Sequence, residues 1–219
     1  MQIMKRFFNL LFIICALHAN LYAQSENFEN VYKACMLAQS SMSYGQGSQS
    51  EIREAANLLT KTPWSPLILQ DVDTKYEASI KNHLVFSPDF FKAAVDNRSV
   101  YKQAKMYQEE QMSTQRGGDV LLCTKCIKAQ KSVIYAIRHT GGISNIAAIA
   151  EVNGLINLSV IVKEQNGQES KPYKITSDEF KGASSRKLQS IKVPKGNSIL
   201  YITIENKSKK DKSVAIIVE

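Results

Sequence analysis

Residues 198–219, SILYITIENKSKKDKSVAIIVE, have the pattern of a β-structure. Two runs rich in β-branched residues, 198–206 and 212–218, flank a polar turn from Asn206 to Lys212. β-branched residues favour strands, and a short polar segment between two such runs is typical of an antiparallel hairpin. The end of the chain is therefore expected to form two antiparallel strands.

The same pattern continues upstream as far as Val120. The turns between the β-rich runs carry Thr140-Gly141-Gly142, Asn153-Gly154 and Gln165-Asn166-Gly167. This spacing predicts an antiparallel β-sandwich, jelly-roll-like, of about eight strands. The strands are expected at residues 120–127, 131–138, 146–152, 156–164, 171–176, 187–193, 198–206 and 212–218.

The first half of the chain follows helical spacing instead. Apolar residues recur on one helical face over residues 26–41. They do so again after Ser48, where Ser48 and Glu51 have capping-box spacing, and this second pattern closes before Pro63. The two segments predict a helical hairpin. Alternation predicts one strand over residues 76–86, and further helices are expected over 88–95 and 99–111.

The fold class is therefore expected to be α+β. Eight of the ten glycines lie at or after Gly117, where helical spacing gives way to strand alternation. We place the domain boundary there, with a mainly helical N-terminal region with one strand at residues 24–113 and the β-sandwich domain at 114–219. A content of 44% apolar and 22% charged residues excludes a disordered chain.

The first 23 residues have the pattern of a signal peptide. Lys5 and Arg6 precede an apolar stretch, and the segment ends on Ala23, the small residue that signal peptidase prefers. No later run approaches 18 apolar residues, so no transmembrane span is expected in the mature chain. We expect export of a mature chain that begins near Gln24, to the periplasm, the outer surface or the medium.

The formal charge of +8 is divided unevenly along the chain. Residues 24–113 hold 9 basic and 11 acidic side chains, whereas residues 114–219 hold 17 basic and 9 acidic ones. The sandwich therefore carries the positive charge, and an anionic partner is expected to meet it there.

Basic side chains crowd two stretches of the sandwich. An electropositive face would suit an anionic glycan, lipid head groups or another envelope protein. The alternative is a set of solvated turns that discourage pairing at sheet edges. Nucleic acid is not expected, because no aromatic residues interleave with the lysines. The candidate binding residues are Arg186, Lys187, Lys192, Lys195, Lys207, Lys209, Lys210 and Lys212.

Three cysteines, Cys35, Cys123 and Cys126, follow the signal segment. In an oxidising compartment one structural disulfide and one spare buried thiol are expected, with the pairing open. Cys123 and Cys126 also have redox spacing, and Lys125 between them could lower a thiolate pKa. On a regular strand, however, residues three apart point to opposite faces, which opposes a bond or a chelate between them. Neither a metal nor a cofactor is expected.

Residues 157–167, NLSVIVKEQNG, resemble the strand and Asn-Gly turn of bacterial pre-peptidase C-terminal domains. Residues 193–196, VPKG, followed by YITI at 201–204, resemble the closing strand of the same domains. Such domains are small β-sandwiches attached to secreted enzymes, so the resemblance implies a role in secretion, surface retention or polymer contact. Asn157 and Ser159 stand where that family often has carboxylates, and no calcium site is expected.

Three functions are compatible with these patterns. The preferred one is an exported non-catalytic accessory or binding protein of the bacterial envelope, whose sandwich contacts a surface polymer or a protein partner. The second is a thiol-based or hydrolytic secreted enzyme using Cys123 or Cys126 with His83 or His139. The third is a structural subunit of an envelope assembly, which an odd cysteine would suit.

Overall fold

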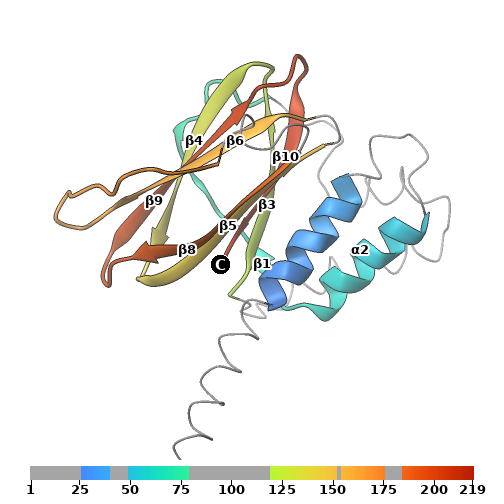
Figure 1. The fold of residues 1–219 in the computed structure, drawn as a ribbon, viewed down its shortest axis with the longest axis horizontal. Coiled ribbons are helices and arrows are strands. Elements are labelled where there is room, and N and C mark those ends of the chain that lie inside the picture. Colours follow the sequence, from blue (N-terminus) through green and yellow to red (C-terminus); the bar gives the residue numbers. More distant parts are fainter. Residues whose placement is uncertain (1–25, 40–48, 79–118, 152–153, 176–183) are drawn as a thin grey trace, which may run out of the picture.

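The computed structural model describes most of the helices and strands that the sequence predicts (Figure 1). The described residues are 26–39, 49–78, 119–151, 154–175 and 184–219. The signal segment, the predicted helices over 88–95 and 99–111 and the predicted boundary at residue 113 lie outside them. Among the described residues, no helix is both long and apolar enough to cross a bilayer.

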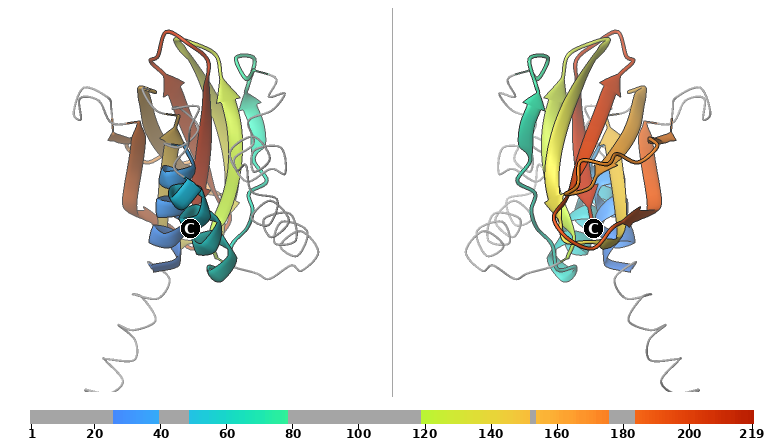
Figure 2. Two further views of the ribbon diagram at one scale, coloured as in Figure 1. Left: turned by 90° about the vertical axis from the view of Figure 1, so that its right-hand side faces the viewer. Right: turned by 90° about the vertical axis from the view of Figure 1, so that its left-hand side faces the viewer.

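Two helices lie together against one side of the molecule (Figures 1 and 2). The first occupies residues 26–39, and the second, α2, is Gln49–Lys61. Phe28 and Cys35 of the first helix share one buried cluster with Ile52 of α2. The predicted helical hairpin is therefore confirmed.

In the described part of the chain, ten strands form two five-stranded sheets packed as a β-sandwich, which confirms the predicted α+β fold. Sheet A has the order β1 (Ser65–Pro66), β3 (Leu121–Ile127), β10 (Lys212–Val218), β5 (Gly142–Ala150) and β8 (Ser185–Val193). Sheet B has the order β2 (Gln70–Asp73), β4 (Lys131–His139), β9 (Ser198–Asn206), β6 (Ile156–Lys163) and β7 (Tyr173–Ile175).

All eight strands expected after residue 119 are present, and β1 and β2 are additional. β1 pairs in parallel with β3, and β2 pairs with β4 through an irregular register between Asp71 and Asp73. The sandwich is therefore antiparallel except at β1. Of the strand predicted over 76–86, only residues 76–78 are described, and there Glu77 makes a single bridge to Ile127.

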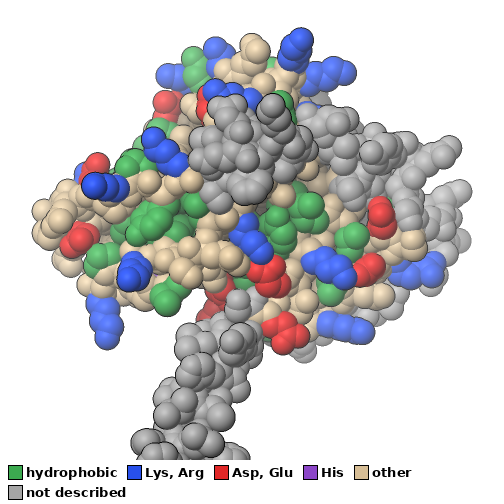
Figure 3. Space-filling view, in the orientation of Figure 1, with side chains coloured by type: hydrophobic (Ala, Val, Ile, Leu, Met, Phe, Trp, Pro, Cys, Tyr) green, Lys and Arg blue, Asp and Glu red, His purple; other side chains and the backbone are tan. Residues whose placement is uncertain are grey.

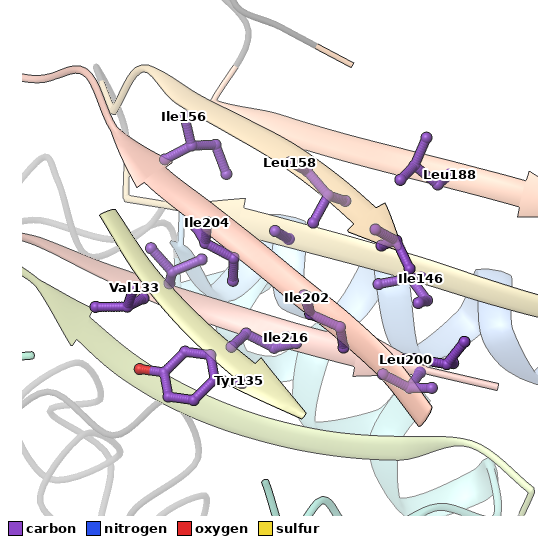
Figure 4. Packing of buried hydrophobic residues seen from close by; sticks show 14 of the residues in the cluster. Val133, Tyr135, Ile146, Ile156, Leu158, Leu188, Leu200, Ile202, Ile204 and Ile216 are labelled. Atoms are coloured by element: carbon purple, nitrogen blue, oxygen red, sulfur yellow. The ribbon is translucent and has the colours of Figure 1, made fainter. Parts of the chain in front are cut away.

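Sheet A is the middle layer of three. On β10, Val214 and Ile216 face sheet B, whereas Ala215 and Ile217 face the helices, and all four are fully buried. Between the sheets, Tyr135 of β4 packs in the same cluster as these inward residues (Figure 4). The helices thus cover the middle of the outer face of sheet A, at β10 and at Ala147 and Ile149 of β5.

Sheet B is buried on one face only. Along β6 and β9 every second residue is buried and the residues between are partly exposed. Tyr201 and Thr203 of β9, with Ile161 of β6 opposite Tyr201, lie on the outer face. Alternation of this kind is typical of a sheet with one solvated face.

The two ends of the sandwich are built by different turns. At one end, Gly141 (φ +110°) lies against the β8–β9 turn, and a Cβ there would sit 2.6 Å from the Cα of Lys195. Only glycine fits that approach. At the other end, the β3–β4 and β9–β10 turns meet, and both reach the top of Figure 1.

Candidate binding surface

The structure does not gather the predicted basic residues on one surface. Lys207, Lys209 and Lys210 are exposed on the β9–β10 turn, whereas Lys192 and Lys195 are exposed at the other end of the sandwich. β9 lies between these ends, and its nine residues separate them by about 27 Å at the usual rise of a strand. One ligand contact cannot include both groups unless the ligand is an extended chain.

Arg186 lies inside the sandwich, with 2% of its surface exposed. It follows the inward alternation of β8, opposite Ala148, as Leu188 does opposite Ile146. Its Nη1 donates a hydrogen bond to the carbonyl of Ser185 at 2.7 Å. A buried guanidinium of this kind belongs to the core of the fold rather than to its surface.

Lys187 and Lys212 are engaged in contacts within the molecule. Lys187 Nζ lies 2.7 Å from Glu29 Oε1 and 4.8 Å from the centre of the Tyr32 ring, so it ties the first helix to β8. The Lys212 side chain is 13% exposed, and its Nζ lies 3.9 Å from Glu151 Oε2. Neither ammonium is presented freely to solvent.

Two lysines that the sequence analysis did not select join Lys207, Lys209 and Lys210. The β3–β4 turn is hydrogen-bonded to the β9–β10 turn, because Gln130 N donates to Ser208 O at 3.2 Å and Ala129 N to Asp211 Oδ1 at 2.9 Å. Lys128 and Lys131, both exposed, are on that β3–β4 connection. The two turns therefore present their lysines at one end of the sandwich.

Asn206 fixes the two turns to each other. The side chain is fully buried, and its Nδ2 lies 2.9 Å from both Ile127 O and Lys210 O, and 3.3 Å from Lys128 O. Its Oδ1 accepts a hydrogen bond from Ser208 N at 2.9 Å. A satisfied buried amide gives the turns one defined arrangement.

A third chain segment reaches the same end. Lys128 N donates to Tyr76 O at 3.0 Å, which places residues 75–78 beside the end of β3. The Tyr76 ring has two ammonium groups near it, Lys75 Nζ at 5.1 Å and Lys131 Nζ at 4.8 Å from its centre. Both distances are within the range of a cation–π contact.

We call the resulting surface the lysine tip. It consists of six exposed lysines: Lys75, Lys128, Lys131, Lys207, Lys209 and Lys210. Three carboxylates lie among them, Asp73 3.7 Å from Lys75, Glu205 2.8 Å from Lys207, and Asp211, which leaves a formal +3. In the described part of the chain no ion pair involves Lys128, Lys131, Lys209 or Lys210. Figure 3 shows basic side chains gathered at this upper end.

Next to the tip, the side chains of Glu77, Tyr135 and Lys125 form a polar cluster. Glu77 Oε2 accepts a hydrogen bond from Tyr135 OH at 2.8 Å, and Glu77 Oε1 lies 3.1 Å from Lys125 Nζ. Burial, with Glu77 as acceptor, holds the pKa of Tyr135 far above its usual range. The tyrosine therefore keeps its proton, and the cluster joins residue 77 to both sheets.

The three cysteines are free thiols, which corrects the predicted disulfide. Cys123 follows the inward register of β3 opposite Ile216, and Cys126 follows the outward register opposite Ser213. The two thiols therefore lie on opposite faces of the strand, as its geometry requires. Cys35 is fully buried among the helices and the outer face of sheet A.

Burial also makes these thiols poor nucleophiles. It raises the pKa of Cys123 to about 12, although Lys125 acts in the opposite direction. Burial raises the pKa of Cys35 and of Cys126 as well. The lowered thiolate pKa that a redox or nucleophilic cysteine needs is thus reversed here.

Nothing in the described part of the chain joins a histidine to a thiol. His139 ends β4 at the end of the sandwich opposite the lysine tip, where its Nδ1 accepts a hydrogen bond from Gly141 N at 3.0 Å. Burial lowers the pKa of His139. His83 lies outside the described residues, and within them no three His, Cys, Asp or Glu side chains are grouped to hold a metal ion.

No protein-family model and no curated protein matches the chain by sequence. Three solved structures share the β-sandwich distantly. The Yersinia pseudotuberculosis-derived mitogen is 16% identical over 45% of this chain and 83% of its own, with a TM-score of 0.30. TmCBM61, solved with beta-1,4-galactotriose, is 9% identical over 47% and 83%, with a TM-score of 0.29. PliG from Aeromonas hydrophila, a periplasmic inhibitor of g-type lysozyme, is 10% identical over 48% and 91%, with a TM-score of 0.30.

These likenesses concern the sandwich alone. Of the resemblance to pre-peptidase C-terminal domains, the two sheets of this chain support the β-sandwich and nothing finer. The described residues thus form an α+β fold, with two helices packed on a two-sheet sandwich.

Proposed function

We propose that this chain is an exported, non-catalytic binding protein of the bacterial envelope that attaches to a polyanionic partner through the lysine tip. One observation carries the proposal. Three segments that are far apart in the sequence, residues 75–77, 128–131 and 207–210, place six exposed lysines at one end of the sandwich. The signal-peptide pattern of residues 1–23 supports export.

The charge arrangement favours a polymer over a small acid. One exposed lysine–carboxylate contact contributes about 0.2–1 kcal/mol in water, so a single acidic group would not be retained. Several anionic groups on one chain add their contacts, because each further contact is then intramolecular. Four of the six lysines are without an ion pair among the described residues and are available for such contacts.

The rigid base of the tip adds to this argument. Asn206 Nδ2 donates to carbonyls next to the β3–β4 turn, and Gln130 N donates to Ser208 O, so the backbone that carries the lysines is ordered before any ligand arrives. Less entropy is lost on binding when the interacting groups are held in place beforehand. A solvated turn that only discourages edge pairing would not need a buried amide beneath it.

The thiol-enzyme alternative has less support. Its residues Cys123 and Cys126 point to opposite faces of β3, and burial raises the pKa of both thiols. A cysteine nucleophile depends on its thiolate and on a nearby base, and the described residues bring His139 to the opposite end of the sandwich.

The test uses two charge-matched variants of the full mature chain. In the tip variant Lys209→Glu and Lys210→Glu are combined, and in the control Lys192→Glu and Lys195→Glu are combined at the other end. Binding to dextran sulfate and to polyphosphate is measured by calorimetry at several salt concentrations. We expect the tip variant to bind about tenfold or more weakly and the control within about twofold, since each lost contact counts locally.

Equal losses in both variants would show that binding follows net charge rather than the tip. Salt-independent binding of the wild-type chain would also contradict the proposal, because contacts between exposed charges weaken as ionic strength rises.

A further inference from the structure

Tyr76 is the aromatic side chain within the lysine tip. It is partly buried and packs at the edge of the core between the sheets, so its ring is held in position. Lys75 Nζ and Lys131 Nζ lie 5.1 and 4.8 Å from the ring centre, which puts the two ammonium groups no more than 9.9 Å apart. Tyr76 joins the lysines of the two turns only through the pairing of residues 76–78 with β3, so the sequence around those lysines does not reveal it.

We infer that the lysine tip takes an anionic polysaccharide, with the Tyr76 ring against one sugar unit and Lys75 and Lys131 on the acidic groups beside it. This inference rests on the proposed function and names its ligand class. The units are hexoses that carry carboxylate or sulfate groups.

The chemistry of an anionic sugar chain matches the tip, where an aromatic ring lies between two ammonium groups. A sugar ring has a face of C–H groups, which the electron-rich face of an aromatic ring attracts, and anionic substituents at its rim. The ammonium groups of Lys75 and Lys131 lie beside the ring, within reach of the acidic groups of a sugar unit that takes their place against its face. A polyanion without sugar rings would use the lysines and not the ring.

A lipid surface fits the tip less well. Val72 and Leu155 are the exposed large apolar side chains on the segments that enter the tip, at 52% and 37% exposure. Val72 lies on β2, and Leu155 precedes β6, which is three strands away in sheet B, a separation of about 14 Å. Interfacial membrane binding relies on a continuous apolar face, which two separated side chains do not provide.

The test compares two polyanions on one set of variants of the mature chain. Tyr76→Leu removes the ring but keeps an apolar side chain against the core, Tyr76→Phe keeps the ring, and Tyr201→Leu is the control, a partly exposed tyrosine outside the tip. We expect Tyr76→Leu to bind dextran sulfate roughly three- to sixfold more weakly and polyphosphate within about twofold of the wild type. Tyr76→Phe and Tyr201→Leu are expected to bind both as the wild type does.

A second measurement avoids any variant. Nitration of Tyr76 in the wild-type protein, read by mass spectrometry, is expected to be suppressed by dextran sulfate and not by polyphosphate. Equal suppression by both, or equal loss of both affinities in Tyr76→Leu, would overturn the inference while leaving a polyanion-binding tip. Tighter binding to vesicles of anionic phospholipid than to dextran sulfate would also overturn it, in favour of a lipid surface. Failure of the proposed function is distinct, because the wild-type chain would then bind neither polyanion.

Discussion

The two sheets of the sandwich bury their strands in different ways. In sheet A, residues 146–150 of β5 and 213–218 of β10 are buried without interruption. In sheet B, β6 and β9 alternate between buried and partly exposed residues along their whole length. An unbroken apolar run indicates a sheet covered on both faces, and alternation indicates a sheet covered on one.

The difference locates function as well as packing. The two helices cover the outer face of sheet A at β10 and at Ala147 and Ile149 of β5, whereas Ile143 and Lys192 remain exposed at one end of that face. Sheet B and the turns at the ends of the sandwich carry many of the exposed charges, among them the lysine tip. Three experiments test whether the two sheets differ in this way.

The largest effect is expected from a charge placed on the outer face of each sheet. Ile217→Lys puts an ammonium group between sheet A and the helices, which should cost about 4 kcal/mol or more and prevent stable folding. Ile161→Lys makes the same change on the outer face of sheet B and should alter the free energy of unfolding by less than about 1 kcal/mol. Urea unfolding followed by circular dichroism measures both. Similar costs would mean that the helices do not protect sheet A.

A smaller effect is expected where the two sheets are joined. Asn206→Ala leaves the buried carbonyls of Ile127 and Lys210 without their donor and should lower the free energy of unfolding by about 2–3 kcal/mol. Asn157→Ala, on the outer face of β6 with its Nδ2 2.8 Å from Glu205 Oε2, is the matched control and should cost under about 1 kcal/mol. Equal changes in the free energy of unfolding for the two variants would show that Asn206 does not link the turns.

The smallest effect at neutral pH is expected for the reactivity of the thiols. Cys123 lies between the sheets, and Cys126 and Cys35 lie on the outer side of sheet A. At pH 8 the intact protein should react with iodoacetamide slowly, Cys126 first and Cys35 last, because burial raises the pKa of each. A folded-state pKa of about 12 for Cys123 against an ordinary 9.0 means that the unfolded chain loses this proton first. Stability should therefore be unaffected below about pH 8 and fall as the pH rises through 9 towards 12. Fast labelling of Cys35 would contradict its burial.

Much of the fold follows from local patterns. The eight strands after residue 119 are recognisable because each has β-rich residues between turn signals, and both helices because of their apolar face. β1 and β2 escape prediction since they have two and four residues, too few for alternation to appear. Their partners, β3 and β4, hold them in place, and a single sequence does not state those pairings.

The candidate site was predictable only in part. Lys207, Lys209 and Lys210 stand out as neighbours in the sequence, but Lys128 and Lys131 join them through hydrogen bonds between two turns. Those contacts depend on strand order, which local patterns leave open. The buried position of Arg186, in contrast, could have been predicted. Arg186 and Leu188 are two residues apart on β8, so the alternation that places Leu188 inside places Arg186 there too.

The short strands β1 and β2 have a consequence for the integrity of the chain. Residues 65–78 hydrogen-bond to Val120 and to Leu122 and Cys126 of β3, and β2 pairs with β4. If a protease cut the backbone between residues 79 and 118, the two pieces would therefore stay associated through these hydrogen bonds. The two pieces would remain a complemented fragment pair, in which the first donates an edge strand to each sheet of the second.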